Sequence, residues 1–427
     1  MRIVIIGGGF AGLRLAQKLN NKEGVDVLVI NKFNFHQFQP LFYQVATAGL
    51  DASNISFPLR KAFHNSSNIR FRLAELVSVE HTEKKIHTTI GPFSYDKLVL
   101  ATGADTNFFG NEKLRKESFP MKSTVEAVQL RHRLLETFEK ALVLRDDPVE
   151  YKKLMTIVIA GGGPTGVELG GALAEMRNNI LPKDYPELDF KQMKIYLLEG
   201  SGKLLAAMSE ESSKQSKYYL DKLGVDVMLN TLVSDYDGNQ VTLKGGTTIP
   251  AKTLIWAAGI TGNVPDGIDT SFVVKGNRIK VDRFNQVIGL ENLYALGDVA
   301  YMETPLFPFG HPQVANVALT QATNLAQNLL RTIKGDKSLE PFEYRDKGSM
   351  ATVGRNLAVV DIPKPRFHFG GFFAWTIWMG LHLFLLLGVK NRIQVFINWV
   401  YKYFTYDQSL RLLIKDERKP WTDARLP

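Results

Sequence analysis

Two glycine-rich turns carry the clearest chemistry in this sequence. GGGFAG begins at Gly7 and GGGPTG begins at Gly161, and each string directly follows a short apolar run. In a GxGxxG string the first glycine permits a tight turn, the second lets the backbone approach a pyrophosphate, and the third lets a helix pack closely on a strand. The helix that follows offers free N–H groups and a partial positive charge to the diphosphate. Each turn therefore predicts a dinucleotide site.

The segments around the two turns repeat one order, which is strand, glycine turn, helix and strand. The strands are expected at 2–6 and 25–30 in the first copy, and at 156–160 and 194–198 in the second. A second pair of strings, KLVLATG and TLIWAAG, ends at Gly103 and Gly259, so these glycines lie 156 positions apart while the turns lie 154 apart. A GxGxxG string is informative in this context. We therefore predict an α/β fold with two Rossmann-like dinucleotide-binding domains.

Three polar residues at strand ends indicate which dinucleotides are bound. Glu199 ends the second strand of the second copy, where a carboxylate accepts from both ribose hydroxyls and repels a 2′-phosphate, which favours NADH over NADPH. The first copy has Asn31 there, a weaker partner for a hydroxyl. Downstream, Asp298 ends a strand before an expected helix. Its carboxylate suits the ribityl chain of a flavin, and a simple helix cap is the alternative.

Composition narrows the possible chemistry further. A chain of 427 residues with 22% charged residues is typical of a globular protein with two or three domains. The chain has no cysteine, which excludes disulfide frameworks, iron–sulfur clusters and thiol redox chemistry, and we expect no metal site. A net charge of +9 suggests attraction to phosphates, nucleic acid or anionic lipid. No secretory signal precedes the first strand, so we expect cytosolic exposure of most of the chain.

The C-terminal tail is both aromatic and basic. Residues 367–389 contain no Asp, Glu, Lys or Arg, 13 of the 40 residues from 367 to 406 are aromatic, and four of the five tryptophans lie between Trp375 and Trp421. Trp and Tyr favour the headgroup boundary of a bilayer. Basic residues flank the uncharged run on both sides, and residues 393–406 mix apolar and polar side chains as an interfacial helix does. We expect helices that lie in one leaflet; a true span and a buried dimer interface are the alternatives.

Beyond these features, the chain resembles the type II NADH dehydrogenases, which are single-subunit NADH:quinone oxidoreductases that do not pump protons. The narrowest matching strings are FHQFQPLFYQVATAGL, HPQVANVALTQATNLAQN and DKGSMATVGRNLAVVDI. The resemblance implies a pyridine nucleotide-disulfide reductase-like flavoprotein fold, with FAD-binding parts at 1–113 and 276–340, an NADH-binding domain at 114–275 and a membrane-associated domain at 341–427. It also implies a lipid quinone as acceptor and peripheral attachment at the cytoplasmic face of the cell inner membrane.

The same resemblance implies the site residues. FAD would be bound by Gly7, Gly9, Phe10, Ala11, Gly12, Asn31, Leu76, Thr102, Asp298, Ala315 and Asn316. NADH would be bound by Gly161, Gly163, Thr165, Gly166, Glu199 and Gly259. The catalytic candidates are Glu168, near the nicotinamide and the quinone, and Lys347, a fixed cation near the flavin ring. Quinone contacts fall to Asn316 and Gln321, where the chain departs from the family pattern, because Asn316 replaces a glutamine and Gln321 is the one glutamine that remains of a pair.

Other classes of protein share parts of this pattern. Ferredoxin-type reductases bind two dinucleotides but need no lipid-facing tail, and sulfide:quinone oxidoreductases work through cysteines. A flavoprotein that mainly binds nucleic acid or serves as a scaffold would use the positive charge. The chain has no long Lys/Arg run, however, and its charge gathers beside the aromatic tail. We therefore expect no nucleic-acid partner, and a homodimer remains open.

Overall fold

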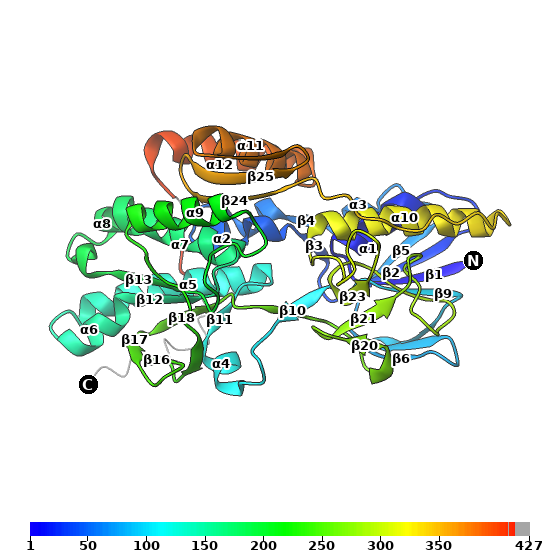
Figure 1. Ribbon diagram of the computed structural model, residues 1–427, viewed down its shortest axis with the longest axis horizontal. Helices are drawn as coiled ribbons and strands as arrows, with labels where there is room; N and C mark the ends of the chain where they lie inside the picture. Colours follow the sequence, from blue (N-terminus) through cyan, green and yellow to red (C-terminus); the bar gives the residue numbers. More distant parts are fainter. Residues whose placement is uncertain (409, 415–427) are drawn as a thin grey trace. The chain divides into compact units, whose positions relative to one another are not determined.

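The computed structural model describes residues 1–408 and 410–414, and its contacts divide the chain into two compact units (Figure 1). The first unit comprises Met1–Gln37, Ser56–Asp105 and Ile260–Asp346, and the second comprises Phe38–Ile55, Thr106–Gly259 and Lys347–Pro427. Trp421 and the last basic residues of the tail lie outside the described residues. Each unit contains one of the two glycine turns.

A parallel five-stranded sheet forms the centre of the first unit. Its order is β22-β9-β1-β2-β5, and β1 carries Ile3, Val4 and Ile5 with no exposed surface, as expected of a strand covered on both faces. Helices α1 (Phe10–Leu19) and α10 (Ala315–Ile333) pack against one another. The strands of this sheet are β1 (Arg2–Ile6), β2 (Asp26–Asn31), β5 (Ile69–Leu73), β9 (Lys97–Leu100) and β22 (Leu293–Ala295).

Smaller elements complete the first unit. They are β3 (Phe35–Gln37) with β4 (Ser56–Pro58), α3 (Leu59–Ala62), the sheet β6 (Leu76–Glu80), β7 (Lys85–Thr88) and β8 (Gly91–Ser94), β10 (Ala104–Thr106) with β19 (Ile260–Gly262), and β20 (Val273–Val274), β21 (Arg278–Val281) and β23 (Ala300–Met302). The expectation of a helix directly after Asp298 is wrong. Gly297–Val299 form a single 3-10 turn, and strand β23 follows because the chain returns to pair with β21.

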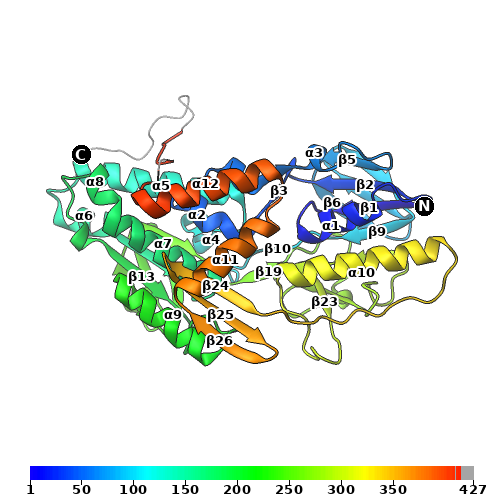
Figure 2. The same cartoon turned by 90° about the horizontal axis from the view of Figure 1, so that it is seen from above.

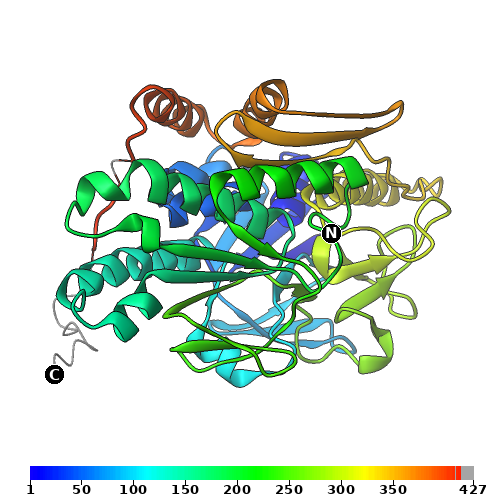
Figure 3. The ribbon, with the colours of Figure 1, turned by 60° about the vertical axis from the view of Figure 1, so that its left-hand side comes forward.

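The second unit is built on another parallel five-stranded sheet, in the order β11-β18-β12-β13-β14. Helices α7 (Pro164–Asn179) and α9 (Glu210–Leu223) cover one face of it (Figure 3). The strands are β11 (Phe119–Pro120), β12 (Thr156–Ala160), β13 (Lys194–Leu198), β14 (Asp226–Met228) and β18 (Thr253–Trp256), and the antiparallel sheet β15 (Val233–Tyr236), β16 (Gln240–Leu243) and β17 (Thr248–Pro250) adjoins them in the chain. The remaining helices are α2 (Phe42–Ala46), α4 (Glu112–Glu117), α5 (Thr124–Val143), α6 (Pro148–Leu154) and α8 (Leu181–Asp184).

The prediction of two Rossmann-like domains is confirmed. Strands β1, β12 and β13 have the predicted bounds, and β2 lies one residue further along than predicted. In each unit the strand before the glycine turn is central and pairs on both sides in parallel. Both turns therefore lie at the carboxyl edge of a parallel sheet, where open α/β sheets bind their ligands.

The C-terminal segment adds a sheet and two helices to the second unit. Strands β24 (Ser349–Gly354), β25 (Leu357–Pro363) and β26 (Arg366–Gly370) are antiparallel, and helices α11 (Phe372–Leu385) and α12 (Val389–Thr405) lie beside them (Figure 2). Strand β24 packs on α7 at Gly171, where a Cβ atom would overlap the carbonyl of Val353. Gly171 therefore lets β24 approach the backbone of α7 closely.

The uncharged run at 367–389 does not form one helix. Its first residues belong to β26, and Gly371 and Gly388, with φ angles of +78° and +85°, precede the two helices. Helix α11 has 14 residues, which corresponds to about 21 Å at ~1.5 Å per residue, against a bilayer core of roughly 30 Å. Among the described residues, no helix has both the length and the apolar character needed to cross a membrane.

Candidate functional site

The two glycine turns have the same backbone geometry. Gly7 and Gly161 have φ angles of +112° and +111°, a conformation that glycine adopts without strain. A Cβ atom on either would overlap a carbonyl at the end of the neighbouring strand, Ala101 for Gly7 and Ala257 for Gly161. In each turn the third glycine packs in the same way against the carbonyl of the first. No side chain therefore separates the start of either helix from the strand ends.

The middle glycine of each turn faces open space. Gly9 and Gly163 are the N-caps of α1 and α7, and no heavy atom among the described residues lies within 4 Å of the position that a Cβ would take on either. No described side chain caps either helix. A diphosphate binds to backbone N–H groups at the start of a helix, where no side chain fills the space beside them. The residues at both turns therefore fit a dinucleotide.

Glu199 and Asn31 brace the two turns through different atoms. The Glu199 carboxylate accepts from the Gly162 N–H at 2.6 Å and from the Ser201 N–H at 2.7 Å. The Asn31 side-chain oxygen accepts from the Gly8 N–H at 2.9 Å, while its amide nitrogen donates to the Phe33 carbonyl at 2.7 Å. The second partner of Asn31, the Phe33 carbonyl, is an acceptor. The side chain at position 31 must therefore also donate a hydrogen bond, which an ionised carboxylate cannot do. This explains why an amide occupies this position in the first copy.

A cavity adjoins Glu199 in the second unit. Its walls include the glycine turn, Phe109, Leu232 and Trp256. The Phe108 and Trp256 rings are stacked with centroids 6.2 Å apart, and Trp256 Nε1 donates to the Asn107 carbonyl at 2.8 Å. Gly259, at the end of the β18 string, lies next to the Phe109 ring. A carboxylate, backbone N–H groups and aromatic walls together suit the adenosine half of a dinucleotide.

The other FAD and quinone candidates lie in the first unit. Gln321 is 1% exposed and its Oε1 accepts from the Gly297 N–H at 2.8 Å, while Gln313 Nε2 donates to the Asp298 carbonyl at 2.9 Å. Two amides therefore hold the turn that carries Asp298. Asn316 and Ala315 are half-buried in the first turn of α10, Leu76 begins β6, and Thr102 donates to the Asn263 carbonyl at 2.6 Å. A direct quinone contact of Gln321 or Asn316 stays a prediction.

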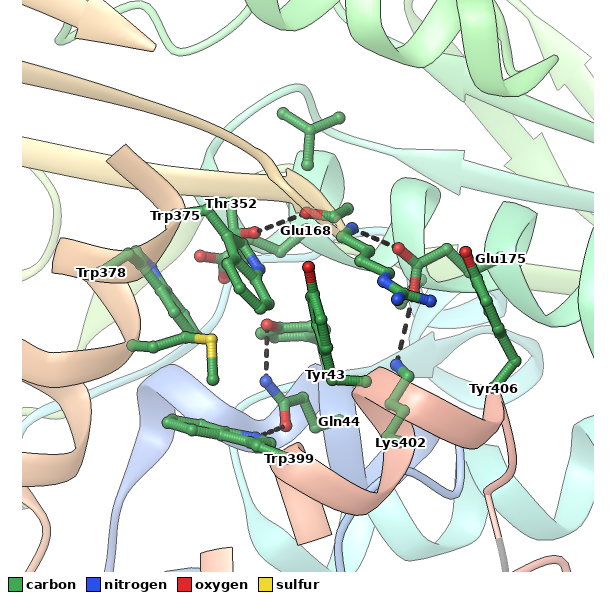
Figure 4. A pocket seen from close by; sticks show the side chains of 16 residues that line it. Tyr43, Gln44, Glu168, Glu175, Thr352, Trp375, Trp378, Trp399, Lys402 and Tyr406 are labelled. Carbon is green, nitrogen blue, oxygen red and sulfur yellow. Dashed lines mark hydrogen bonds and ion pairs between the residues drawn. The ribbon is translucent and has the colours of Figure 1, made fainter. Parts of the chain in front are cut away.

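Glu168 faces a second cavity, which we call the aromatic pocket (Figure 4). Residues of α2, α7, β24, α11 and α12 line it, and Glu168 and Glu175 share one face of α7 because they are seven residues apart. The pocket is lined by Tyr43, Gln44, Glu168, Ala172, Glu175, Thr352, Val353, Gly354, Arg355, Trp375, Trp378, Met379, Trp399, Lys402, Tyr403 and Tyr406. Lys347, the other catalytic candidate, is exposed before β24, and its proximity to a flavin stays a prediction.

Burial raises the pKa of the Glu168 carboxyl to about 8, because the charged form would lose its hydration. The Thr352 backbone and the Trp378 side chain act in the opposite direction. The indole Nε1 of Trp378 is buried and interacts with the Glu168 carboxyl, with no other partner among the described groups. At neutral pH, Glu168 is therefore mostly an uncharged acid that can give a proton, and the Trp378 indole N–H lies in the same pocket.

Two of the four tail tryptophans are buried, although the sequence pattern indicated a place at a headgroup boundary. Trp378 is 1% exposed and Trp399 is 7% exposed, and their ring centroids lie 6.0 Å apart. The exposed faces of α11 and α12 are instead aliphatic and phenylalanine-rich. The exposed apolar side chains there are Phe372, Phe373, Ile377, Leu381, Phe384, Leu385, Val389, Ile393, Phe396, Ile397, Val400, Tyr401 and Phe404.

Sequence reasoning missed most residues of the aromatic pocket. Tyr43 and Gln44 lie in a string that marked the family, but nothing in that string indicated that Trp399, 355 positions later, contacts Gln44. Glu175 also passed unnoticed, although its spacing from Glu168 is the signal that could have found it. It forms an ion pair with Lys402 of α12 at 3.3 Å.

Comparisons with known proteins agree with this geometry. The pyridine nucleotide-disulphide oxidoreductase family matches residues 1–322, and the NDH2 C-terminal domain matches residues 347–406. The type II NADH:quinone oxidoreductase Ndh of Mycobacterium tuberculosis is 33% identical, over 98% of this chain and 91% of its own length. A type II NADH:quinone oxidoreductase of Staphylococcus aureus is 27% identical over 83% of this chain and 87% of its own.

Solved structures share the fold at lower identity. The structure of NDH2 from Plasmodium falciparum in complex with NADH has a TM-score of 0.86 and 22% identity, and the match covers 97% of this chain and 99% of that one. A sulfide:quinone oxidoreductase from Aquifex aeolicus follows with a TM-score of 0.68 and 20% identity, covering 97% of this chain and 96% of that one.

The raised pKa of Glu168 predicts a pH-dependent difference in stability between the protein and Glu168→Gln. Below pH 4.5 the carboxyl is protonated in both states; above it the unfolded chain ionises while the folded carboxyl stays neutral up to about pH 8. The unfolding free energy of the parent should therefore fall relative to the variant, by up to about 1.4 kcal/mol per pH unit in that window. Urea unfolding at pH 5, 6, 7 and 8 measures the difference. Glu187→Gln, at an exposed position, is the control, and equal slopes for both variants would contradict the assignment.

Proposed function

Because this chain belongs to the type II NADH:quinone oxidoreductases, we propose that it oxidises NADH and reduces a lipid quinone by two electrons, with FAD between them and without pumping protons. The observation that carries the proposal is the pair of matched glycine turns, one in each unit, with an open middle glycine at the start of a helix. FAD, when bound, supplies the transfer of a hydride in and two electrons out.

We assign the first unit to FAD and the second to NADH. In the first unit Gly9, Phe10 and Ala11 present backbone N–H groups at the start of α1, and Asp298 accepts from hydroxyl groups of the flavin chain. Asn31 holds the turn rather than supplying charge, since both its side-chain atoms have partners in the protein. In the second unit Glu199 braces the turn and keeps a carboxylate beside the ribose, which favours NADH over NADPH.

We assign the aromatic pocket to the head group of the quinone. Aromatic and aliphatic walls suit a flat ring, and the pocket includes residues of α11 and α12, whose other faces are exposed and apolar. Reduction of a quinone to a quinol consumes two electrons and two protons. The hydride of NADH accounts for both electrons and one proton, and Glu168, mostly protonated at neutral pH, passes the second proton, which solvent replaces.

We further propose that α11 and α12 attach the protein to the cytoplasmic face of the cell inner membrane. Thirteen apolar side chains on these two helices are exposed, while Lys390 and Arg392 flank the start of α12. Exposed apolar surface of this extent is typical of a membrane or partner interface, and basic residues beside it favour anionic headgroups.

The redox assignment predicts two colour changes in stopped-flow mixing. The purified protein should be yellow, NADH should bleach it, and a water-soluble quinone should restore the colour within the turnover time. If bleaching occurs but the quinone does not restore the colour, the acceptor assignment is wrong while the NADH assignment stands. A colourless protein that does not take up added FAD would contradict the proposal as a whole.

The membrane assignment predicts that Phe373→Glu with Phe384→Glu releases the protein from vesicles. Both rings are more than 70% exposed and neither lines the aromatic pocket. A phenylalanine that moves from water into the membrane contributes roughly 1.5–3 kcal/mol of transfer free energy. Binding of the variant to vesicles with anionic lipid should therefore fall at least about tenfold in a sedimentation assay. Val149→Glu, at an exposed apolar position on α6, is the matched control. Equal binding of both variants would contradict the assignment.

A further inference from the structure

The side chain of Gln44 connects a tryptophan of α12 to a tyrosine of the aromatic pocket. Trp399 Nε1 lies 2.7 Å from Gln44 Oε1, and Gln44 Nε2 lies 2.8 Å from the Tyr43 phenol oxygen (Figure 4). All three side chains line the pocket, and Tyr43 and Trp399 are each 7% exposed. The three residues form a continuous hydrogen-bonded chain that begins on a tail helix and ends at a phenol.

The chemistry of these groups fixes which group donates and which accepts in each hydrogen bond of the chain Trp399–Gln44–Tyr43. An indole N–H can only donate, so the Gln44 atom that faces it must be the carbonyl oxygen. The amide nitrogen therefore faces Tyr43 and can only donate to it. The phenol oxygen thus accepts, and the phenol hydrogen is left free for another acceptor. Hydrogen bonds in such a chain also polarise one another, which strengthens the terminal donor.

Two further donors lie in the pocket with the Tyr43 phenol. Trp378 Nε1 has no partner among the described groups other than the Glu168 carboxyl, and the Trp378 ring centroid lies 6.3 Å from that of Tyr43. Glu168, whose carboxyl interacts with both Tyr43 and Trp378, adds an acidic O–H at neutral pH. Burial also raises the pKa of the Tyr43 phenol well above its usual value, so it stays protonated. A ligand that fits here should offer flat apolar surface and hydrogen-bond acceptors.

We propose that Tyr43 is the hydrogen-bond donor to a carbonyl oxygen of the quinone, and that Gln44 and Trp399 are positioning residues that keep its hydrogen directed into the pocket. This inference rests on the proposed function. As each C=O becomes C–OH, negative charge develops on the oxygen, and a fixed donor stabilises it. Tyr43 keeps its proton; NADH supplies a hydride, which is equivalent to two electrons and one proton, and solvent supplies the second proton through Glu168.

Because Gln44 must accept from Trp399 and donate to Tyr43, the near-isosteric substitution Gln44→Glu is informative. In Gln44→Glu a carboxylate still accepts from Trp399 but now also accepts from Tyr43, which turns the phenol hydrogen away from the pocket. Gln44→Glu should therefore resemble Tyr43→Phe, with kcat/KM for a water-soluble quinone lowered by about 100-fold. The rate at which NADH bleaches the flavin should stay unchanged in both. Reduction of ferricyanide, which has no carbonyl to bind, should also stay unchanged.

Two further variants distinguish a positioning role of Gln44 from a general loss of structure around α12. Asn54→Asp changes another buried amide that contacts α12, through Gln394 and Asn398, outside the aromatic pocket, and should leave quinone reduction unchanged. In the double variant Tyr43→Phe/Gln44→Glu the second change should add no further loss, because Gln44 acts through the phenol hydrogen.

Three results would overturn the inference. They are wild-type quinone kinetics in Tyr43→Phe or in Gln44→Glu, additive losses in the double variant, and a loss of ferricyanide reduction in step with quinone reduction. A parent protein that NADH bleaches but quinone never reoxidises would instead refute the proposed function, so the two failures are distinguishable.

Discussion

A backbone contact between glycines is the constraint on which this molecule depends. In both units the third glycine of the turn packs against the carbonyl of the first, with no room for a side chain between them. This contact brings the start of a helix, with N–H groups that no described side chain caps, to the end of a central parallel strand. A diphosphate satisfies those groups, so the same constraint that shapes the turn also creates the binding site. One chain thereby carries two such sites.

Helices α11 and α12 each line the aromatic pocket with one face and present exposed apolar side chains on the other. Trp378 and Trp399 point inward, where Trp378 stacks on the neutral, buried His382 with ring centroids 3.9 Å apart. The outward faces carry phenylalanine and aliphatic side chains. The helices that line the pocket therefore also carry the exposed apolar surface. The tail aromatics are thus divided by function: indoles hold the pocket, and phenyl rings cover the exposed face.

The parts of this structure that the sequence predicted depend on local patterns. Strands β1 and β12 are short apolar runs that end at glycine turns, helices α1 and α7 follow those turns directly, and β13 is the apolar run that ends at Glu199. The aromatic pocket could not be predicted in that way, because Tyr43, Glu168 and Trp399 come from distant segments that no periodicity relates. The uncharged run at 367–389 likewise did not indicate that its start pairs as β26, with Gly371 between that strand and α11. Asn31 departs from the expected acidic residue because its second partner is a carbonyl.

The most direct test of two separate dinucleotide sites is to place a side chain at the middle glycine of each turn separately. Gly9 and Gly163 have negative φ angles and no heavy atom near the Cβ position, so valine fits the protein but occupies the space of a diphosphate. Bound flavin per chain and the KM for NADH are measured for Gly9→Val and Gly163→Val. We expect Gly9→Val to lose its flavin, and Gly163→Val to keep one flavin per chain with a KM raised at least about tenfold. Full flavin in Gly9→Val, or loss of flavin from Gly163→Val, would contradict the account.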